Sequence, residues 1–162
     1  MYDDEYFYMA AKVRDDVHYG DDPTGADRSW WMDSIQFAIS EENEISSPYT
    51  ELSVALADDG RSILQKYIDV NQGDPTFDKT TYNIFDEGTE VKIAIDGAIK
   101  TYEVKVPWSE ITLSKSRPLN DIYFSAVINE NDGAGRNSFV QWAEGIGQNK
   151  SAAKFISLPM NK

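Results

Sequence analysis

The sequence contains no cysteine and a single histidine, His18, and both scarcities exclude classes of site. Without cysteine the chain can form no disulfide, no thiolate nucleophile and no zinc–thiolate centre. One histidine gives little support to a serine-protease type of triad, which needs an imidazole beside its nucleophile. The chemistry of this chain must therefore rest on carboxylates, amides, basic groups and aromatic rings.

Basic residues are also few: 15 lysines and arginines stand against 28 aspartates and glutamates, which gives a net charge of −13 and a pI near 4.3. This balance argues against nucleic acid and anionic membrane surfaces as partners, because both require a basic patch. It suits neutral or cationic ligands and divalent cations. The alternative reading is that the charge keeps a secreted or halotolerant protein soluble.

No apolar run approaches the ~20 residues of a membrane span, and the N-terminus lacks the basic and apolar regions of a signal peptide. We therefore expect no membrane insertion. Met1 is followed almost at once by what reads as a full strand. We expect a domain excised from a longer exported protein, either secreted or displayed at the cell surface.

The 162 residues, 41% of them hydrophobic and 12% aromatic, suit one globular domain over 1–162. Short segments of alternating or apolar residues predict strands, and turn residues separate them. No helical stripe exceeds a turn or two, the clearest being 108–111. The pattern predicts an all-β fold, an antiparallel β-sandwich of jelly-roll or immunoglobulin-like type. The expected strands are 6–14, 34–39, 51–57, 62–70, 90–95, 100–106, 122–128, a short strand ending at Trp142, and 154–158.

The stretch 121–142 holds the most informative residues. Its apolar strand stops at Asn-Glu-Asn-Asp-Gly, 129–133, turn residues whose side-chain oxygens are suitable ligands for hard metal ions. Arg136 and Trp142 follow, so one strand brings carboxylates, amides, a guanidinium and an indole to one end of the fold. A surface that binds polyhydroxylated ligands needs flat apolar rings together with planar polar groups.

The tryptophans are the candidate stacking residues. Trp30 and Trp31 end a long polar loop, 15–30, and strand geometry would direct only one of them into the core. Trp142 lies at a strand end beside glycines. Two indoles flanking a cleft would bury much of a sugar ring, each contributing on the order of 1–2 kcal/mol. The alternative is that all three cap a core whose aromatic members are Phe7, Phe37, Tyr102 and Phe124.

The acidic residues suggest a metal. Asp15 and Asp33 lie around one loop and Asp132 lies in another, and calcium takes six to eight oxygen ligands that separate loops can supply. The local sequence lacks the spacing of an EF-hand, and solvated turn residues are the alternative. A glycosidase would need two carboxylates across a cleft, and none of the 28 acidic residues carries a recognisable signature of one.

Several short motifs in this order resemble family 9 carbohydrate-binding modules, over nearly the whole chain. The most specific is Tyr102-Glu103-Val104-Lys105-Val106-Pro107-Trp108. The others are Asp3-Asp4-Glu5-Tyr6-Phe7-Tyr8 with Val13-Arg14-Asp15, Trp30 with Asp33-Ser34-Ile35, and Asn129 to Asp132 with Arg136 and Trp142. These modules are β-sandwiches attached to secreted xylanases and other polysaccharide-degrading enzymes.

The resemblance implies a non-catalytic, monomeric module that holds the end of a polysaccharide or oligosaccharide such as cellulose or xylan. By motif, Trp30 and Trp142 would sandwich the sugar, Trp31 would lie beside them, and Arg136 would contact hydroxyls or pair with Asp132. Gln36 stands where the family often has a glutamate that makes a polar contact with the sugar. The expected ligand-binding residues are thus Trp30, Trp31, Gln36, Arg136 and Trp142. The resemblance also implies structural calcium, a covalently linked catalytic domain and a first strand that would precede Met1.

Three other classes remain open at this point. A structural or interaction domain of a cell-surface protein, stiffened by calcium, would lack a shared cleft between Trp142 and Trp30 or Trp31. A small jelly-roll glycanase would need two facing carboxylates in that cleft. A haem-binding relative would need axial ligands, for which His18 with Met9, Met32 or Met160 are the candidates.

Overall fold

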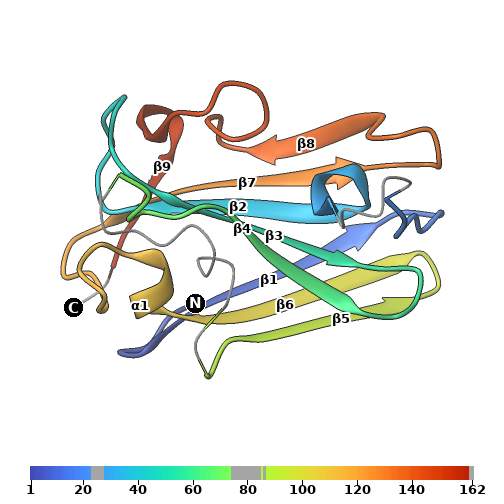
Figure 1. The fold of residues 1–162 in the computed structure, drawn as a ribbon, viewed down its shortest axis with the longest axis horizontal. Helices are drawn as coiled ribbons and strands as arrows, with labels where there is room; N and C mark the ends of the chain where they lie inside the picture. Colours follow the sequence, from blue (N-terminus) through green and yellow to red (C-terminus); the bar gives the residue numbers. More distant parts are fainter. Residues whose placement is uncertain (23–27, 74–84, 86, 161–162) are drawn as a thin grey trace.

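A computed structural model describes residues 1–22, 28–73, 85 and 87–160, which fold as two antiparallel sheets packed face to face (Figure 1). The smaller sheet has the order β1 (Tyr6–Arg14), β6 (Ile99–Pro107), β5 (Glu90–Asp96). The larger sheet has the order β4 (Ser62–Ile68), β3 (Thr50–Leu56), β2 (Ser34–Ser40), β7 (Ile122–Glu130), β8 (Ser138–Trp142), and β9 (Ile156–Leu158) pairs with the start of β7. The predicted antiparallel β-sandwich is confirmed.

The predicted strands match the observed ones to within two residues at each end. The last one, predicted as 154–158, begins two residues late at Ile156, because η2 (Ala152–Lys154) forms a 3-10 turn. The other helical segments are η1 (Ser29–Trp31) and α1 (Trp108–Ile111), the latter as predicted. The described residues include no helix long and apolar enough to cross a membrane. Parts of the predicted loops 15–30 and 71–79 lie outside the described residues.

The core lies between the two sheets and is built on aromatic rings. The Phe7 ring centroid lies 6.4 Å from that of Phe37, 6.1 Å from that of Phe124 and 5.5 Å from that of Trp108. Tyr102 is also buried, so the predicted core aromatics are confirmed. Rings at these distances, tilted to one another, are favourable beyond the area that they bury.

The opposite, outer face of the larger sheet is covered as well. The segment between β8 and β9 returns along β7 (Figure 1), and its Ile146 and Phe155 pack on Ala38 and Val127. As a result all seven residues of β2 are buried, the polar ones included. Buried polar groups must be hydrogen-bonded, so this outer face carries a fixed polar arrangement.

Candidate functional site

A hollow with a volume of about 380 Å³ opens on the outer face of the larger sheet. This size is within the range of small-molecule sites, which bind ligands through a few fixed polar groups on apolar walls. Three of the five ligand residues predicted from the sequence meet here, namely Trp30, Gln36 and Arg136. Its other walls are Tyr67, Ile68, Ile146, Gly147 and Lys150.

Trp30 is fixed by the buried hydroxyl that precedes it. Ser29 Oγ lies 2.7 Å from Ser53 Oγ and 2.8 Å from Gln65 Oε1, which binds η1 to β3 and β4. The Trp30 backbone N–H donates to Tyr67 Oη over 3.1 Å. The indole and the phenol therefore reach the hollow from a turn and a strand that are bonded to each other, with little freedom to move apart.

Trp31 supports Trp30 and is not among the residues that line the hollow. The two indoles lie edge to face with centroids 5.7 Å apart, and the Arg28 guanidinium carbon is 5.2 Å and 5.4 Å from their centroids. A Cβ on Gly135 would come within 2.9 Å of the Trp31 ring, so glycine is required where the loop crosses the indole. We expected only one of the two indoles to pack inward, because neighbouring residues of a strand face opposite ways. Trp30 and Trp31 belong to a 3-10 turn instead, so that expectation does not apply to them.

Trp142 lies on the other face of the sheet. It pairs with Ala126, whose side chain packs on the core between the sheets, whereas the neighbouring Val127 packs outward. Directly opposed residues in an antiparallel pair share a face, and Trp142 indeed packs edge-on against Phe124 at 5.5 Å, with 56% of its surface exposed. The predicted pair of Trp30 and Trp142 around one ligand is therefore not present in this geometry. Among the described residues no shared cleft joins Trp142 to Trp30 or Trp31, so that criterion does not separate a sugar-binding module from a structural domain here.

A chain of hydrogen bonds forms the floor of the hollow. Lys150 Nζ donates to both carboxylate oxygens of the fully buried Glu51, each over 2.5 Å. Gln36 Nε2 donates to Glu51 Oε1 over 2.9 Å and its Oε1 accepts from Asn129 Nδ2 over 2.9 Å. Arg136 Nη1 donates to Asn129 Oδ1 over 3.1 Å. The two cations of the hollow are thus joined through three buried polar side chains, and Arg136 contacts Asn129 rather than the alternative partner Asp132.

Burial raises the pKa of the Glu51 carboxyl, and contacts with Lys150 and Gln36 oppose that rise. Burial also raises the pKa of Tyr49 to about 12, with a smaller contribution from the charge of Glu51. A glutamate at position 36 would place a second carboxylate within hydrogen-bonding distance of Glu51, and like charges at that distance disfavour ionisation. The amide of Gln36 avoids this conflict.

Sequence reasoning missed Tyr67, Lys150 and Glu51 as residues of this site. Glu51 begins a predicted strand. An acidic side chain on a strand that is buried on both faces would indicate a functional residue, but the burial of this strand is known only from the fold. Lys150 reaches the hollow because the segment after β8 turns back over the sheet. No local motif marks that return.

Two of the three predicted metal ligands, Asp15 and Asp132, lie together, and Glu130 joins them. Ligand oxygens of these three residues all lie within 4.8 Å of one another. Burial raises the pKa of the Glu130 carboxyl, and the negative charges of Asp15, Asp33 and Asp132 raise it further. Crowded carboxylates of this kind fit a hard cation such as calcium, which would add to the positive charge of the Lys100 ammonium that contacts Asp15.

The third predicted ligand, Asp33, is bound otherwise. Its carboxylate accepts from Lys100 Nζ over 2.7 Å, and from the backbone N–H groups of Tyr19 over 2.7 Å and Asn131 over 2.9 Å. The same ammonium also contacts Asp15. A lysine therefore occupies the place between Asp15 and Asp33 that the sequence analysis assigned to a metal, and Asp33 drops out of the candidate ligand set.

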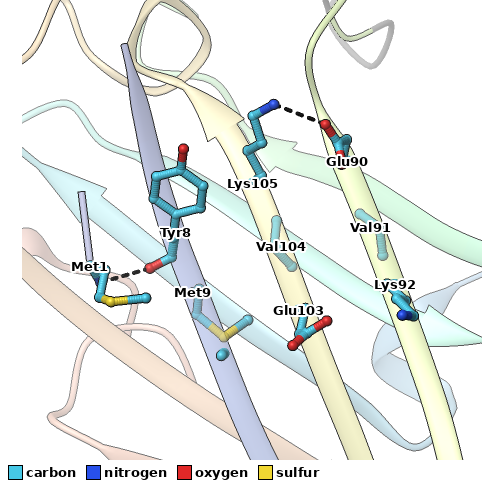
Figure 2. Close-up of a pocket in the computed structure, with 10 residues that line it drawn as sticks. Met1, Tyr8, Met9, Glu90, Val91, Lys92, Glu103, Val104 and Lys105 are labelled. Carbon is cyan, nitrogen blue, oxygen red and sulfur yellow. Dashed lines mark hydrogen bonds and ion pairs between the residues drawn. The ribbon is translucent and has the colours of Figure 1, made fainter. Parts of the chain in front are cut away.

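Another hollow crosses the smaller sheet and is the weaker candidate. Figure 2 shows Tyr8, Lys105 and Glu90 along it, with the Lys105 ammonium 2.8 Å from the Glu90 carboxylate. That ammonium also lies 4.2 Å from the Tyr6 ring centroid. None of the described lining residues is a tryptophan, and of the two lysines that line it Lys105 is already paired with Glu90.

The hollow on the outer face offers no pair of facing carboxylates. Among the described residues that line it there is no aspartate or glutamate, and Glu51 beneath it is held by Lys150. The retaining and inverting mechanisms both need two carboxyl groups that reach the substrate. The geometry therefore favours binding over glycoside hydrolysis at this position.

Comparisons with known proteins identify the family and support the fold. The profile of the family described as carbohydrate family 9 binding domain-like matches residues 1–159, and no curated protein matches the chain significantly. The fold is similar to that of a family 9 carbohydrate-binding module from Caldicellulosiruptor kristjanssonii solved with glucose, with a TM-score of 0.68 and 17% identity over 99% of this chain and 73% of that chain. A family 9 module from the same organism solved with cellotriose has a TM-score of 0.67 and 17% identity, over 98% of this chain and 71% of that chain. Family 9 comprises carbohydrate-binding modules, which are not catalytic, and with its profile spanning 159 residues this chain belongs to that family.

Proposed function

We propose that the chain binds sugar without catalysis in the outer-face hollow, with the ring of the sugar against Trp30. The observation that carries this is the convergence of a rigidly held indole with the phenol of Tyr67, the amide of Gln36 and the cations Lys150 and Arg136. The indole can stack on the apolar face of a pyranose, and the phenol, the amide and the two cations can form hydrogen bonds with its hydroxyl groups.

The energetics divide between the ring and its hydroxyls. Burying the apolar face of a pyranose against one indole contributes on the order of 1–2 kcal/mol. Ile68 and Ile146 add apolar wall. The sugar hydroxyls can accept hydrogen bonds from Lys150 and Arg136, and can donate to or accept from the Tyr67 hydroxyl. With a single indole in the hollow, we expect stacking on one side of the sugar and polar contacts on the other.

The solved family 9 modules that share this fold were crystallised with glucose and with cellotriose. By analogy we propose a β-linked glucan or xylan oligosaccharide as ligand. We further propose that the chain is a monomeric module of a secreted or cell-surface protein, where it directs a covalently linked polysaccharide-degrading enzyme to its substrate.

The test is isothermal titration calorimetry with glucose, cello-oligosaccharides and xylo-oligosaccharides, followed by sedimentation with insoluble cellulose and xylan. We expect saturable binding to at least one oligosaccharide series and no release of reducing sugar on long incubation. A folded protein that binds nothing in this panel would contradict the proposal.

Calcium is a second candidate ligand, at a different place. We propose that Asp15, Glu130 and Asp132 hold one calcium ion between the loop after β1 and the loop after β7, because three carboxylates meet there beside an already crowded acidic group. Calcium should raise the melting temperature over that in a chelator, and Asp132→Asn should remove most of the increment. Stabilisation by calcium without any sugar binding would favour the structural-domain alternative.

A further inference from the structure

We propose that the hollow prefers an acidic sugar, a hexuronic acid residue, over its neutral counterpart. This inference rests on the proposed function, because it names the class of sugar that the same site selects. The chain is strongly acidic overall, with 28 acidic residues against 15 basic ones, so a cation without an acidic partner is informative.

Among the described lysines and arginines, Arg136 is the one that is partly buried and has no carboxylate within ion-pair distance. Eight others have a side-chain nitrogen within 4.0 Å of a carboxylate, namely Arg28, Arg61, Lys66, Lys100, Lys105, Arg117, Lys150 and Lys154. The described lysines and arginines without such a pairing are Lys12, Arg14, Lys92 and Lys115, which are exposed, and Arg136, which is partly buried. In a protein with 28 acidic residues, a partly buried guanidinium without a carboxylate beside it points to an anion from outside.

The Arg136 guanidinium is held in place for such a contact. Its Nη1 donates to Asn129 Oδ1 over 3.1 Å, and its central carbon lies 5.0 Å from the Phe139 ring centroid. Asn129 in turn is fixed by bonds to Ser34 and Gln36. A guanidinium has five N–H donors, and one bond to an amide leaves several for a carboxylate, which this fork can grip with two parallel bonds.

The hollow as a whole has the charge balance that a carboxylate requires. Its charged lining residues are Arg136 and Lys150, and the Glu51 carboxylate that Lys150 contacts is buried and bound by it. With Gln36 in place of an acid, these groups sum to one positive charge. A uronate would neutralise it, whereas a neutral sugar would leave it without a partner.

The contribution of the sugar carboxylate is measured by comparing the Kd values of an acidic and a neutral sugar in one buffer. Methyl glucuronide and methyl glucoside have the same ring and differ at carbon 6, so the ratio of their Kd values reports the carboxylate. We expect the wild type to favour the glucuronide about tenfold, the order expected of one charge-assisted hydrogen-bonding pair. Acetate at the same concentration should not compete, which separates a sugar acid from a simple carboxylate.

Two arginine variants show where the preference arises. Arg136→Gln should abolish most of the preference. Arg14→Gln removes the same charge from an exposed position on β1 and should leave the ratio unchanged, so it controls for the overall charge of the protein. If Arg136→Gln does not fold, Arg136→Lys keeps the charge without the fork and should reduce the preference in part.

The outcomes separate the two proposals. Binding of methyl glucoside at least as tight as that of the glucuronide would overturn this inference and leave sugar binding standing. A preference that survives Arg136→Gln, or full competition by acetate, would overturn it as well. Absence of binding to either glycoside and to neutral oligosaccharides would overturn the proposed function itself.

Discussion

The two faces of β2 show how differently one strand can be used. The inward Phe37 and Ile39 pack on aromatic rings from both sheets, whereas the outward Ser34 and Gln36 belong to a hydrogen-bonded network. Both faces are buried, the first by the smaller sheet and the second by η1 and the segment after β8. Alternation along a strand predicts which face is apolar, but whether the polar face meets water depends on what folds over it. A polar face that is covered must be fully paired, and such pairing gives a site its rigidity.

The two faces should therefore respond differently to mutation. Apolar packing loses free energy in proportion to the cavity that a substitution leaves. Buried hydrogen bonds contribute modestly when complete, but leaving one partner unsatisfied is costly. Inner-face variants should lower stability, whereas outer-face variants should alter recognition and lower stability only where they leave a buried polar group without its partner.

The largest effect is expected on the inner face. Phe37→Ala should lower the free energy of unfolding by about 3–5 kcal/mol, because a fully buried ring is lost from the aromatic core. Urea denaturation followed by circular dichroism measures this. Val140→Ala, at a residue that is 70% exposed, serves as a control and should change stability by less than about 0.5 kcal/mol. A loss below about 1 kcal/mol for Phe37→Ala would remove the contrast between the faces.

A smaller effect, on binding rather than stability, is expected at the tryptophans. Trp30→Ala should weaken sugar binding by about 2 kcal/mol, roughly 30-fold in Kd, as for other buried aromatic anchors. Trp142→Ala should leave Kd nearly unchanged, because that indole lies on the opposite face of the sheet. Calorimetry on both variants decides, and an equal loss for the two would restore the paired arrangement that the sequence suggested.

The floor of the hollow offers a test that depends on pH. Lys150→Met should cost about 1–3 kcal/mol of stability by leaving the Glu51 carboxylate buried without its ammonium. Burial already raises the pKa of Glu51 above its ordinary 4.5. Between 4.5 and the raised value the folded state keeps a proton that the unfolded state has lost, so stability falls as pH rises through that window. The variant should widen the window, and melting curves from pH 4 upward would show it.

Adding Glu51→Gln to Lys150→Met removes the buried charge and provides the control. The double variant should recover most of the lost stability near neutral pH and lose the extra dependence on pH. If the double variant is no more stable than Lys150→Met, the cost does not arise from the uncompensated carboxylate.

The smallest effect concerns the acidic cluster. Because burial and neighbouring carboxylates raise the pKa of Glu130, a calcium ion bound there must displace a proton at mildly acidic pH. Calcium affinity should therefore fall as pH is lowered, beginning above the ordinary value of 4.5. Glu130→Gln should weaken calcium binding and flatten this dependence, which titration with an indicator dye can follow. An affinity that does not change with pH would place the ion elsewhere.

Much of the fold could be predicted from local pattern. Alternation placed Phe37 and Phe124 in the core, and the turn residues Asp96 and Gly97 marked the hairpin of β5 and β6. The exception, β9, begins late because a 3-10 turn precedes it, and three residues of strand are too few to show a period.

The site was predictable only in part. Trp30 and Arg136 were found because their residue types suit a sugar, and Gln36 was found through the family resemblance. All three meet in the hollow. Trp142 was misplaced because its face depends on the register of β8 against β7, which spacing in the sequence does not reveal. Asp33 was misplaced because Lys100, distant in sequence, takes the position of a cation beside it.

The most direct test of the account is to follow the four tryptophan indole N–H signals by NMR during titration with cellotriose. The account predicts a saturable shift of the Trp30 signal, with a smaller one for the adjacent Trp31, while the signals of Trp108 and Trp142 stay in place. A shift of the Trp142 signal with Trp30 unmoved would contradict it, because the sugar would then lie on the other face of the sheet.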